Sequence, residues 1–378
     1  MFHKSKPITF LLPSFQPGGL QRVAINLLKQ MHQLGIPLDI VVASGEGAYL
    51  NEIPAGIRVI DFHKPIEDRI SSASRIIFPL VHYLQKEKPQ ALVSHLNVFN
   101  VVAAMAKMLA ISPVNLILVE HTSFSITYDK RTKHYGIREE ALPILRRWFY
   151  PRADGLVAVS KGLAQELETY LRMKPGSIQT IYNPVIDESL NSKVKVPLEH
   201  PWFQPGEPPV ILGMGRLSQE KDFPTLIRAF LLVRQLQPAR LVILGEGKEQ
   251  SKLNSLIHKL GLENDVAIPG FVSNPYPYLA GSAAFILSSY REGLPTVIIE
   301  AMAVGTPVVS TDCPNGPAEI LDRGKYGELV TVGDSEAMAK AILRVLSGNS
   351  KSIDASWLEQ FTLTTATQKY LDLMGISF

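Results

Sequence analysis

Short apolar runs alternate with helix-length segments along this chain, a pattern that few folds accommodate. In the first half, the runs of strand length cover residues 8–12, 38–43, 58–61, 91–94, 116–120 and 155–160. Helix-length segments such as 20–34, 98–109 and 162–171 lie between them. Such alternation is typical of a parallel sheet that helices cover on both faces. Because ligands of such sheets bind at the carboxyl ends of the strands, functional residues are expected there.

The length of the chain and one proline-rich stretch predict two domains. At 378 residues the chain is too long for one ordinary hydrophobic core. Six of the 27 residues 183–209 are proline, and proline-rich polar stretches form stiff connectors. A second series of apolar runs and helix-length segments follows, and an amphipathic segment, 356–373, comes near the end. We therefore expect an α/β protein with domains at 1–185 and 206–355, and a C-terminal segment at 356–378.

The composition excludes several classes of protein. With 46% hydrophobic and 19% charged residues, the chain is expected to be globular and soluble. No apolar run reaches the length of a membrane-spanning helix, and the run 8–12 is too short for a signal peptide. The single cysteine, Cys313, allows no intramolecular disulfide and no cysteine zinc site, which indicates a cytoplasmic protein. A net charge of +3 is too small to indicate a nucleic-acid partner.

Residues 284–321 carry the strongest functional signal. The apolar run 284–288 is followed by a polar turn, and a helix is expected to open at Pro295, since proline suits a first helical position. This helix is apolar nearly all round except for Glu300. A buried carboxylate without partners is costly, so Glu300 needs hydrogen-bond donors from the fold or from a ligand.

The spacing of Glu292 and Glu300 suggests such a ligand. Eight positions of helix, rising about 1.5 Å each, separate the two carboxylates by about 12 Å, with the helix N-terminus between them. A helix N-terminus attracts phosphate. A nucleotide diphosphate sugar has the same layout, with sugar hydroxyls, a diphosphate and ribose hydroxyls in order. The alternative is that Glu292 is a surface residue and Glu300 is paired with a lysine.

These residues resemble a known signature. Glu292, Gly293, Leu294, Pro295, Thr296 and Glu300 resemble the Glu-x7-Glu motif of family 4 retaining glycosyltransferases of the GT-B fold. Gly270-Phe271-Val272 and residues 305–309 are similar to the same family. The resemblance implies two Rossmann-like domains facing each other across a cleft, with the acceptor bound by the first and the nucleotide sugar by the second. It also implies a C-terminal helix that crosses back to the first domain.

A second motif follows the strand expected at the start of the second domain. Gly213 and Gly215 suggest a dinucleotide fingerprint, but Ser218 stands where its third glycine belongs, which weakens a nicotinamide-enzyme interpretation. Arg216 and Lys221 flank the turn. Two cations there would neutralise a diphosphate without a metal. The alternative is two surface charges, with one paired to Glu220.

The resemblance gives these cations a role as well. In the family, Gly-Arg-Leu followed by Glu-Lys holds the diphosphate of the donor. Because the chain has no Asp-x-Asp metal clamp, we expect no metal and no cofactor, only a nucleotide diphosphate sugar, UDP-linked, as donor substrate.

Two further strand ends, both in the first half, carry candidate residues. Gly18 and Gly19 precede a helix, and paired glycines let a backbone approach a phosphate closely, although they equally well make a simple turn. His121 follows the strand 116–120, and Glu120, Thr122 and Ser123 are candidates to orient it. The resemblance implies that the glycine loop closes over the donor and that His121 lies beside the reacting sugar.

The resemblance thus implies a complete site. The donor-binding residues are Gly18, Gly19, Arg216, Lys221, Gly270, Phe271, Val272, Glu292, Gly293, Leu294, Pro295, Thr296 and Glu300. The catalytic residues are His121, Glu292, Arg216 and Lys221. Within the set, the resemblance assigns Glu300 to the ribose, Glu292 to the sugar hydroxyls, and the backbone at Phe271 and Val272 to the base.

A basic stretch points to the acceptor. Between Lys130 and Arg152, seven lysines and arginines face two glutamates, and apolar and aromatic residues including Trp148 and Tyr150 lie among them. Such a stretch suits the surface of an anionic membrane, whereas an ordinary solvated helix is the alternative. Together with the Glu-His-Thr-Ser strand end, which resembles that of bacterial lipopolysaccharide enzymes, it predicts a lipid-linked or lipopolysaccharide glycan acceptor. We therefore expect a peripheral position on the inner face of the cytoplasmic membrane.

Two other functions remain compatible with these motifs. A sugar-nucleotide epimerase shares the GT-B fold, and analysis of products with and without an acceptor would separate it from a transferase. A non-catalytic module that binds a sugar nucleotide is the other alternative. The presence of Arg216, Lys221, Glu292 and Glu300 together argues against such a module.

Overall fold

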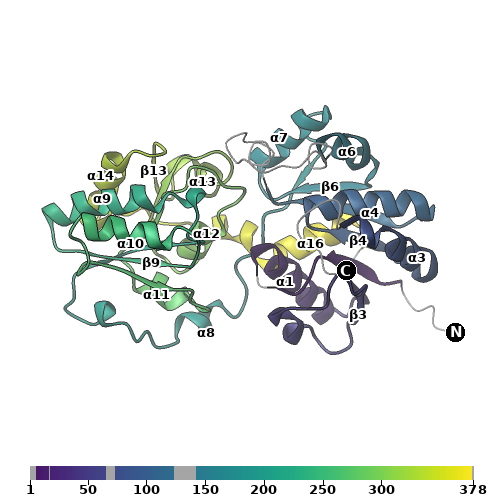
Figure 1. Cartoon of the computed structure of the whole chain (residues 1–378), viewed down its shortest axis with the longest axis horizontal. Helices are drawn as coiled ribbons and strands as arrows, with labels where there is room; N and C mark the ends of the chain where they lie inside the picture. The colour runs from purple at the N-terminus through teal and green to yellow at the C-terminus, as the bar shows by residue number, and fades with distance from the viewer. Residues whose placement is uncertain (1–5, 17, 65–72, 123–141, 377–378) are drawn as a thin grey trace. The chain divides into compact units, whose positions relative to one another are not determined.

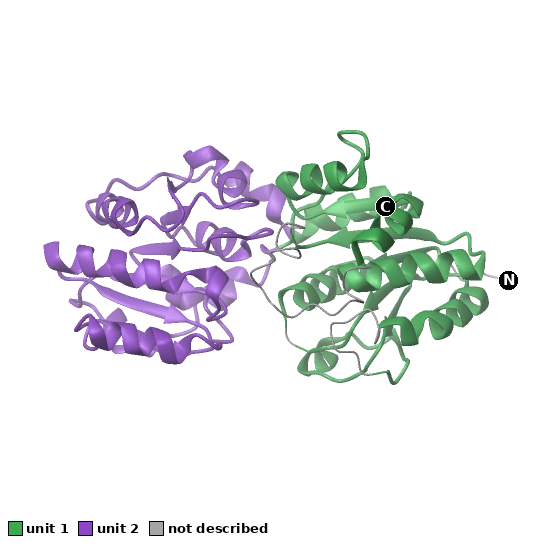
Figure 2. Cartoon of the chain, turned by 45° about the horizontal axis from the view of Figure 1, so that its top comes forward, with its two compact units in different colours: residues 1–184, 363–378 green, residues 185–362 purple. Residues whose placement is uncertain are grey.

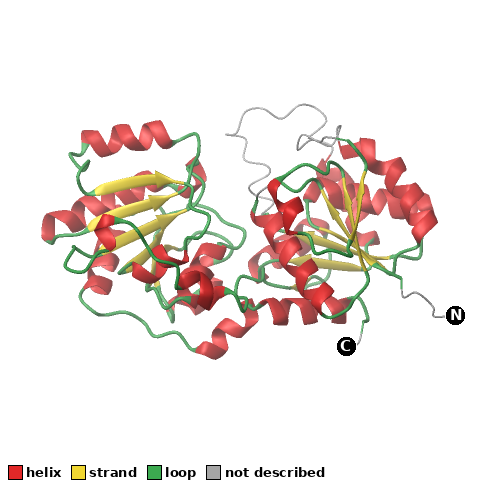
Figure 3. Cartoon of the chain, turned by 90° about the horizontal axis from the view of Figure 1, so that it is seen from below, coloured by secondary structure: helices red, strands yellow, loops and turns green. Residues whose placement is uncertain are grey.

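The computed structural model describes residues 6–16, 18–64, 73–122 and 142–376. The chain forms two compact units (Figure 2). Unit 1 comprises residues 1–184 and 363–378, and unit 2 comprises residues 185–362. Each unit is a parallel sheet with helices packed against it (Figure 3). The α/β class expected from the alternation of apolar runs is therefore confirmed.

Unit 1 contains a parallel sheet of seven strands among the described residues, in the order β3-β2-β1-β4-β5-β6-β7. The strands are β1 (Ile8–Leu12), β2 (Leu38–Val42), β3 (Arg58–Asp61), β4 (Ala91–Ser94), β5 (Asn115–Glu120), β6 (Gly155–Ala158) and β7 (Gln179–Thr180). The central strands are buried along their whole length, which explains their continuous apolar sequence. The strand order reverses between β1 and β4, where ligands of such sheets bind.

The helices of unit 1 follow the strands (Figure 1). They are α1 (Gly19–Gln33), α3 (Ile77–Glu87), α4 (Asn97–Ala110), α6 (Leu142–Phe149), α7 (Lys161–Leu171) and α16 (Leu363–Leu373), with 3-10 turns η1 (Ala48–Glu52), η2 (Ser74–Ile76) and η3 (Tyr150–Arg152). Helix α4 packs between α3 and α6, and α1 packs against α16. Ser160 is the N-cap of α7, and its Oγ accepts a hydrogen bond from the Leu163 backbone N–H at 3.2 Å.

Unit 2 repeats this architecture with a parallel sheet of six strands, β10-β9-β8-β11-β12-β13, in the part of the chain that the structure describes. The strands are β8 (Val210–Met214), β9 (Arg240–Leu244), β10 (Val266–Gly270), β11 (Ala284–Leu287), β12 (Val308–Thr311) and β13 (Glu328–Val330). Here the order reverses between β8 and β11. The loops that follow these two strands therefore lie side by side.

The helices of unit 2 enclose its core. They are α8 (Leu190–Val194), α9 (Phe223–Leu236), α10 (Gln250–Lys259), α11 (Tyr276–Gly281), α12 (Thr296–Ala303), α13 (Pro317–Ile320), α14 (Ser335–Leu346) and α15 (Ala355–Leu358), with 3-10 turns η4 (Pro201–Phe203), η5 (Gln219–Lys221), η6 (Asp322–Gly324) and η7 (Glu359–Phe361). Helices α9 and α14 pack against each other. Together with α10 they bury Phe223, Phe230 and Ile342 against the strands.

The structure differs from the expected connector between domains. Residues 185–205 cluster with unit 2, because their backbone and aromatic groups bind there. The Val185 N–H donates to the Phe361 carbonyl at 3.0 Å, and the Asn274 side chain donates to the Lys193 carbonyl at 2.8 Å. The Phe203 ring lies 5.4 Å from the Tyr278 ring. The boundary between the units thus lies at the start of the proline-rich stretch, and the rest of the stretch packs onto unit 2.

The C-terminal segment is not one continuous helix, although the resemblance implies one. It breaks at Thr362, and α15 remains in unit 2, where Trp357 Nε1 donates to the Ile320 carbonyl at 2.8 Å. Helix α16 instead returns to unit 1, as the resemblance implies for the end of the chain. No helix within the described ranges is long and apolar enough to span a membrane.

Candidate active site

The two loops at the switch point of unit 2 hold the principal candidate residues. Strands β8 and β11 are hydrogen-bonded neighbours, with Gly213 opposite Ile286. Arg216 and Lys221 follow β8, and Glu292 follows β11. Lys221 and Glu292, 71 positions apart in the sequence, are therefore adjacent in space because of the strand order.

Lys221 and Glu292 form an ion pair. Lys221 Nζ lies 2.6 Å from Glu292 Oε1, and Ser289 Oγ donates to the same oxygen at 2.7 Å. Both side chains are largely buried, with 18% and 12% of their surface exposed. The alternative of two surface charges is therefore wrong for Lys221, which is largely buried and paired with Glu292. The proposed sugar-binding carboxylate and the proposed phosphate-binding cation instead bind each other in this structure.

Glycines shape the loop that carries Lys221. Gly215 has a φ of +152°, and a Cβ there would lie 3.3 Å from Lys221 Cε. The lysine stem therefore passes directly over this glycine. On the other side, a Cβ at Gly247 would lie 2.2 Å from the Leu217 carbonyl oxygen, so the turn 245–247 packs tightly on the loop. The Leu217 N–H also donates to the Glu246 carbonyl at 2.8 Å, which holds the loop in place.

Arg216 lies on the outer side of this loop. It is exposed and has no ion-pair partner among the described residues. With residues 217–220 and 246–249 it lines an open hollow of about 740 Å³. A guanidinium in such a position is available to bind an anion.

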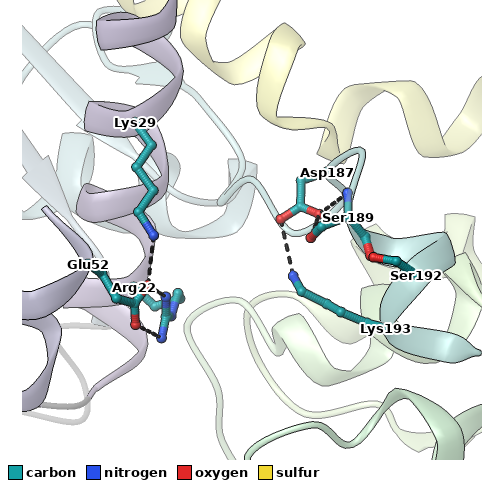
Figure 4. A network of polar contacts seen from close by, with 7 residues as sticks. All are labelled: Arg22, Lys29, Glu52, Asp187, Ser189, Ser192 and Lys193. Atoms are coloured by element: carbon teal, nitrogen blue, oxygen red, sulfur yellow. Dashed lines mark hydrogen bonds and ion pairs between the residues drawn. The ribbon is translucent and has the colours of Figure 1, made fainter. Parts of the chain in front are cut away.

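Glu300 lies on α12, and its carboxylate has no hydrogen-bond partner among the described residues. Burial raises the pKa of its carboxyl to about 7, and the charge of Lys193 opposes this shift only in part. No hydrogen bond joins its carboxylate to any residue that the structure describes. Lys193 instead makes an ion pair with Asp187 at 3.3 Å (Figure 4). The alternative of a lysine-paired Glu300 is therefore wrong, and the carboxylate is left for a ligand.

The N-terminus of α12 lies between the two glutamates in sequence. The helix begins at Thr296, one position later than expected, and Pro295 is its cap residue. Its first turn carries no acidic residue, and no side chain of the described residues caps it. A Cβ at Gly316 would lie 2.4 Å from Pro295 Cδ, so the loop after β12 packs against this terminus. The backbone N–H groups here suit an anion.

The end of β10 presents an aromatic side chain. Phe271 is 70% exposed, and its N–H donates to Glu246 Oε1 at 3.3 Å. Gly270 before it has a φ of +94°, in the region that favours glycine. Val272 follows and is half-buried. An exposed ring at a strand end offers a flat apolar surface for a planar ligand.

In unit 1, the glycine pair lies at the start of α1. Gly18 is the cap residue with an extended φ of −175°, and Gly19 is the first helical residue. A Cβ at Gly19 would meet nothing within 4 Å, so the fold itself does not require glycine there. On the same helix, Arg22 and Lys29 both bind Glu52 of η1, at 2.6 and 2.7 Å (Figure 4). These ion pairs lower the pKa of Glu52 to about 2 and tie α1 to η1.

His121 lies directly after β5 and contacts a second histidine that the sequence analysis did not single out. His121 Nε2 is 3.2 Å from Nδ1 of His95, which follows the neighbouring strand β4. Burial lowers the pKa of His121 to about 4. His95 also follows directly after an apolar strand. The position at a strand end that made His121 a candidate therefore makes His95 one as well.

The expectation that Glu120 orients His121 is wrong. Glu120 Oε1 accepts hydrogen bonds from Tyr150 Oη and, at 3.2 Å, from Asn100 Nδ2. Successive residues of a strand point to opposite faces, so Glu120 and His121 diverge. Thr122 is exposed, and Ser123 lies outside the described residues.

The basic stretch is only partly described. Lys130, Arg131, Lys133, Arg138, Glu139 and Glu140 lie outside the described residues. Arg146 is 1% exposed and its charge acts on Glu120, so its expected place on a basic surface is wrong. Arg147 and Arg152 are exposed and lie over the rings of Tyr170 and Trp148. Within the described ranges, no group of three or more histidine, cysteine or acidic side chains is arranged to hold a metal.

Comparisons with known proteins give a consistent result. Residues 17–189 match the model "Glycosyltransferase Family 4" and residues 199–356 match "Glycosyl transferases group 1". A Campylobacter jejuni N-acetylgalactosamine-N,N'-diacetylbacillosaminyl-diphospho-undecaprenol 4-alpha-N-acetylgalactosaminyltransferase is 29% identical and covers 88% of each chain. The Rhizobium meliloti lipopolysaccharide core biosynthesis glycosyltransferase LpsE is 27% identical over 95% of this chain and 96% of its own. The Anabaena HepE structure with UDP superposes with a TM-score of 0.76 at 23% identity, covering 98% of this chain and 99% of its own.

Proposed function

Because the chain belongs to the GT-B glycosyltransferases whose two domains these family models describe, we propose that it is a retaining enzyme of lipid-linked or lipopolysaccharide glycan synthesis. It transfers a hexose or N-acetylhexosamine from a UDP-linked sugar to the growing glycan. The observation that carries this proposal is the arrangement around α12, where the Lys221–Glu292 ion pair comes before the helix N-terminus and the unpartnered Glu300 comes after it.

Donor binding exchanges the partners of these residues. Glu300 accepts hydrogen bonds from the two ribose hydroxyls, which restores the donors that its carboxylate lacks. The diphosphate approaches the N–H groups at the start of α12 and takes Lys221 as its counter-ion. Glu292 is thereby released from Lys221 and accepts hydrogen bonds from hydroxyls of the sugar. Arg216 supplies a second positive charge to the diphosphate.

The reaction needs charge stabilisation at the leaving group above all. The bond between the sugar carbon and the phosphate oxygen breaks, and negative charge grows on that oxygen, where Lys221 and Arg216 act. The acceptor hydroxyl attacks from the same face, and the departing phosphate oxygen takes its proton. The product keeps the configuration of the donor. Retaining glycosidases use two carboxylates about 5 Å apart, and this mechanism uses no such pair.

One experiment tests the function directly. Purified protein is incubated with radiolabelled UDP-sugars and bacterial lipid extract, and the anomeric configuration of the product is determined. Acceptor-dependent transfer with retention supports the proposal. Interconversion of the sugar nucleotide without an acceptor indicates an epimerase, and binding without turnover indicates a sugar-nucleotide-binding module.

EDTA is expected to leave transferase activity largely intact, because side chains rather than a metal neutralise the diphosphate. The measurement is the initial rate with and without chelator after dialysis, with added magnesium or manganese as the control. Complete loss of activity that either metal restores would show that the phosphate site has been assigned incorrectly.

The acceptor side of unit 1 carries an exposed apolar and basic surface. On α6, Ile144 and Trp148 are exposed, and Ile111 is exposed at the end of the neighbouring α4. The exposed Arg147 is on the same helix, and the exposed Arg152 lies over the Trp148 ring. Tryptophan with arginine suits the interface of an anionic membrane. This surface supports a peripheral position on the inner face of the cytoplasmic membrane.

Replacing both Arg147 and Arg152 by glutamate is expected to release the protein from anionic vesicles, since each cation near such a surface contributes about 1 kcal/mol. Arg146 is left unchanged because it is buried. Co-sedimentation at low salt measures the effect, and raised salt should mimic it. Lys259→Glu with Lys340→Glu in unit 2 is the control of equal charge. Wild-type protein that ignores the vesicles at low salt would favour a soluble acceptor.

A further inference from the structure

The carboxyl ends of β4 and β5 bring two histidine rings together. Strands β4 and β5 are hydrogen-bonded neighbours in unit 1. His95 Nδ1 lies 3.2 Å from His121 Nε2, and the two ring centroids are 5.4 Å apart. The short contact between nitrogens requires that one ring donates its N–H and that the other accepts it.

His95 is held firmly in the core of unit 1. It is 1% exposed, and its ring stacks on Phe10 of β1 at 5.8 Å between centroids. The ring of Tyr370 from α16 lies 6.3 Å away on tilted planes. The second ring nitrogen of His95, Nε2, is buried and has no hydrogen-bond partner among the residues that the structure describes. The contact with His121 is therefore the polar interaction that places this ring.

The burial of Nε2 decides which ring donates. Desolvation and the neighbouring His121 lower the pKa of His95 well below its usual value, so both rings are neutral and each carries one N–H. If the His95 proton were on Nε2, a buried N–H would lack an acceptor, at a cost of about 1–3 kcal/mol. With the proton on Nδ1, that N–H donates to His121, and only a lone pair is left unpaired. Orphaned buried N–H groups are rarer than unpaired acceptors.

We propose that His95 is a positioning residue that donates its Nδ1–H to Nε2 of His121 and thereby holds His121 in the tautomer protonated on Nδ1. His121 then presents Nδ1–H to the donor sugar as a hydrogen-bond donor. It does not act there as a base, because its only lone pair is taken by His95. This inference rests on the proposed function for its ligand, but the tautomer is a property of the free protein.

Nitrogen NMR of the full-length wild-type protein tests the tautomer. The sample is labelled with ¹⁵N-histidine, held at pH 8, and His121 is assigned from the spectrum of His121→Asn. The expected result is a directly bonded proton on Nδ1 of His121 and none on its Nε2. A proton on Nε2 of His121 overturns the proposal. This outcome does not depend on activity, so it is separate from any failure of the proposed function.

Two matched variants test the consequence for catalysis. In His95→Asn, the amide nitrogen occupies the place of Nδ1 and keeps the donor. In His95→Gln, the amide nitrogen occupies the place of Nε2, and the donor to His121 is lost. We expect His95→Gln to lower kcat about ten- to a hundredfold with little change in donor KM, the scale of losing a partner that orients an imidazole. His95→Asn should keep kcat within about threefold.

Thermal melts show whether the two variants fold equally well. Equal loss of kcat in two equally stable variants overturns the proposal, because a structural role alone would explain it. If either variant does not fold, the wild-type nitrogen spectrum decides. A protein with the expected tautomer but without transferase activity would overturn the proposed function and leave the His95–His121 assignment standing.

Discussion

Lys221→Ala is expected to lower kcat/KM by about two to three powers of ten, the scale of losing one preorganised charge contact in a transition state. The lysine neutralises the leaving diphosphate, and its stem is already held over Gly215 before the donor arrives. Arg216→Ala should cause a loss of similar size. Arg216→Lys should recover only part of it, since a point charge does not reproduce the planar guanidinium. Initial rates of radiolabel transfer at varied donor concentration give these values.

The ion pair with Glu292 requires one more variant. Lys221→Ala leaves a largely buried carboxylate unpaired, and this alone disturbs the site. The double variant Lys221→Ala with Glu292→Gln removes that unpaired charge. Low activity in the double variant is expected, whereas recovery would mean that Lys221 serves only to hold Glu292. Lys340→Ala, an exposed lysine on α14, is the control and should be nearly normal.

Glu300→Gln is expected to stabilise unit 2 above pH 7 while lowering donor affinity about ten- to a hundredfold. Burial raises the pKa of the Glu300 carboxyl to about 7 from a usual value of 4.5. Between these two values the folded protein binds more protons than the unfolded chain, so stability falls as pH rises from about 4.5 to 7. The full cost, on the order of 1–3 kcal/mol, is present above pH 7 and absent below pH 4.5. Glutamine has no charge and avoids it.

Thermal melts of both proteins at pH 5 and pH 8 measure this effect, and titration calorimetry with UDP measures binding. The expected result is a higher Tm for the variant at pH 8 and a smaller difference at pH 5. Glu336→Gln on the exposed side of α14 is the matched control and should change neither quantity. Unchanged UDP affinity in Glu300→Gln would remove this carboxylate from the ribose site.

Two of the proposed functional groups lack partners among the described residues, where a ligand is proposed to supply them. Glu300 has no hydrogen bond within the described ranges, and Arg216 has no ion pair there. By contrast, Glu52 and Asp39, which have no proposed function, are fully paired with cations. Since charges shielded from water are normally compensated, the uncompensated Glu300 carboxylate marks the site, whereas Arg216 is exposed to solvent and Lys221 and Glu292 compensate each other.

Local sequence patterns predicted most strands of the first sheet and the alternation of strands and helices that forms the second. The expected strands of unit 1 are all present, with ends that differ by at most two residues. The central strands were predictable because continuous burial leaves a continuous apolar run. The apolar helix that carries Glu300 was also predicted, since it depends on neighbours in the chain. Helices α3 and α6 were not singled out from the sequence.

The identity of the functional motifs likewise came from the sequence, because motifs such as Glu292-x7-Glu300 consist of residues close together along one loop and one helix. The partners of those residues were decided only by the tertiary structure. Lys221 binds Glu292 rather than Glu220 because β8 and β11 are adjacent in the sheet. Glu120 diverges from His121 because the two faces of a strand alternate. Arg146 is buried, with its charge acting on Glu120, because α6 packs beside α4. His95 meets His121 because β4 lies beside β5. Such contacts depend on strand order and on the direction of each side chain, and no local pattern of residues records either.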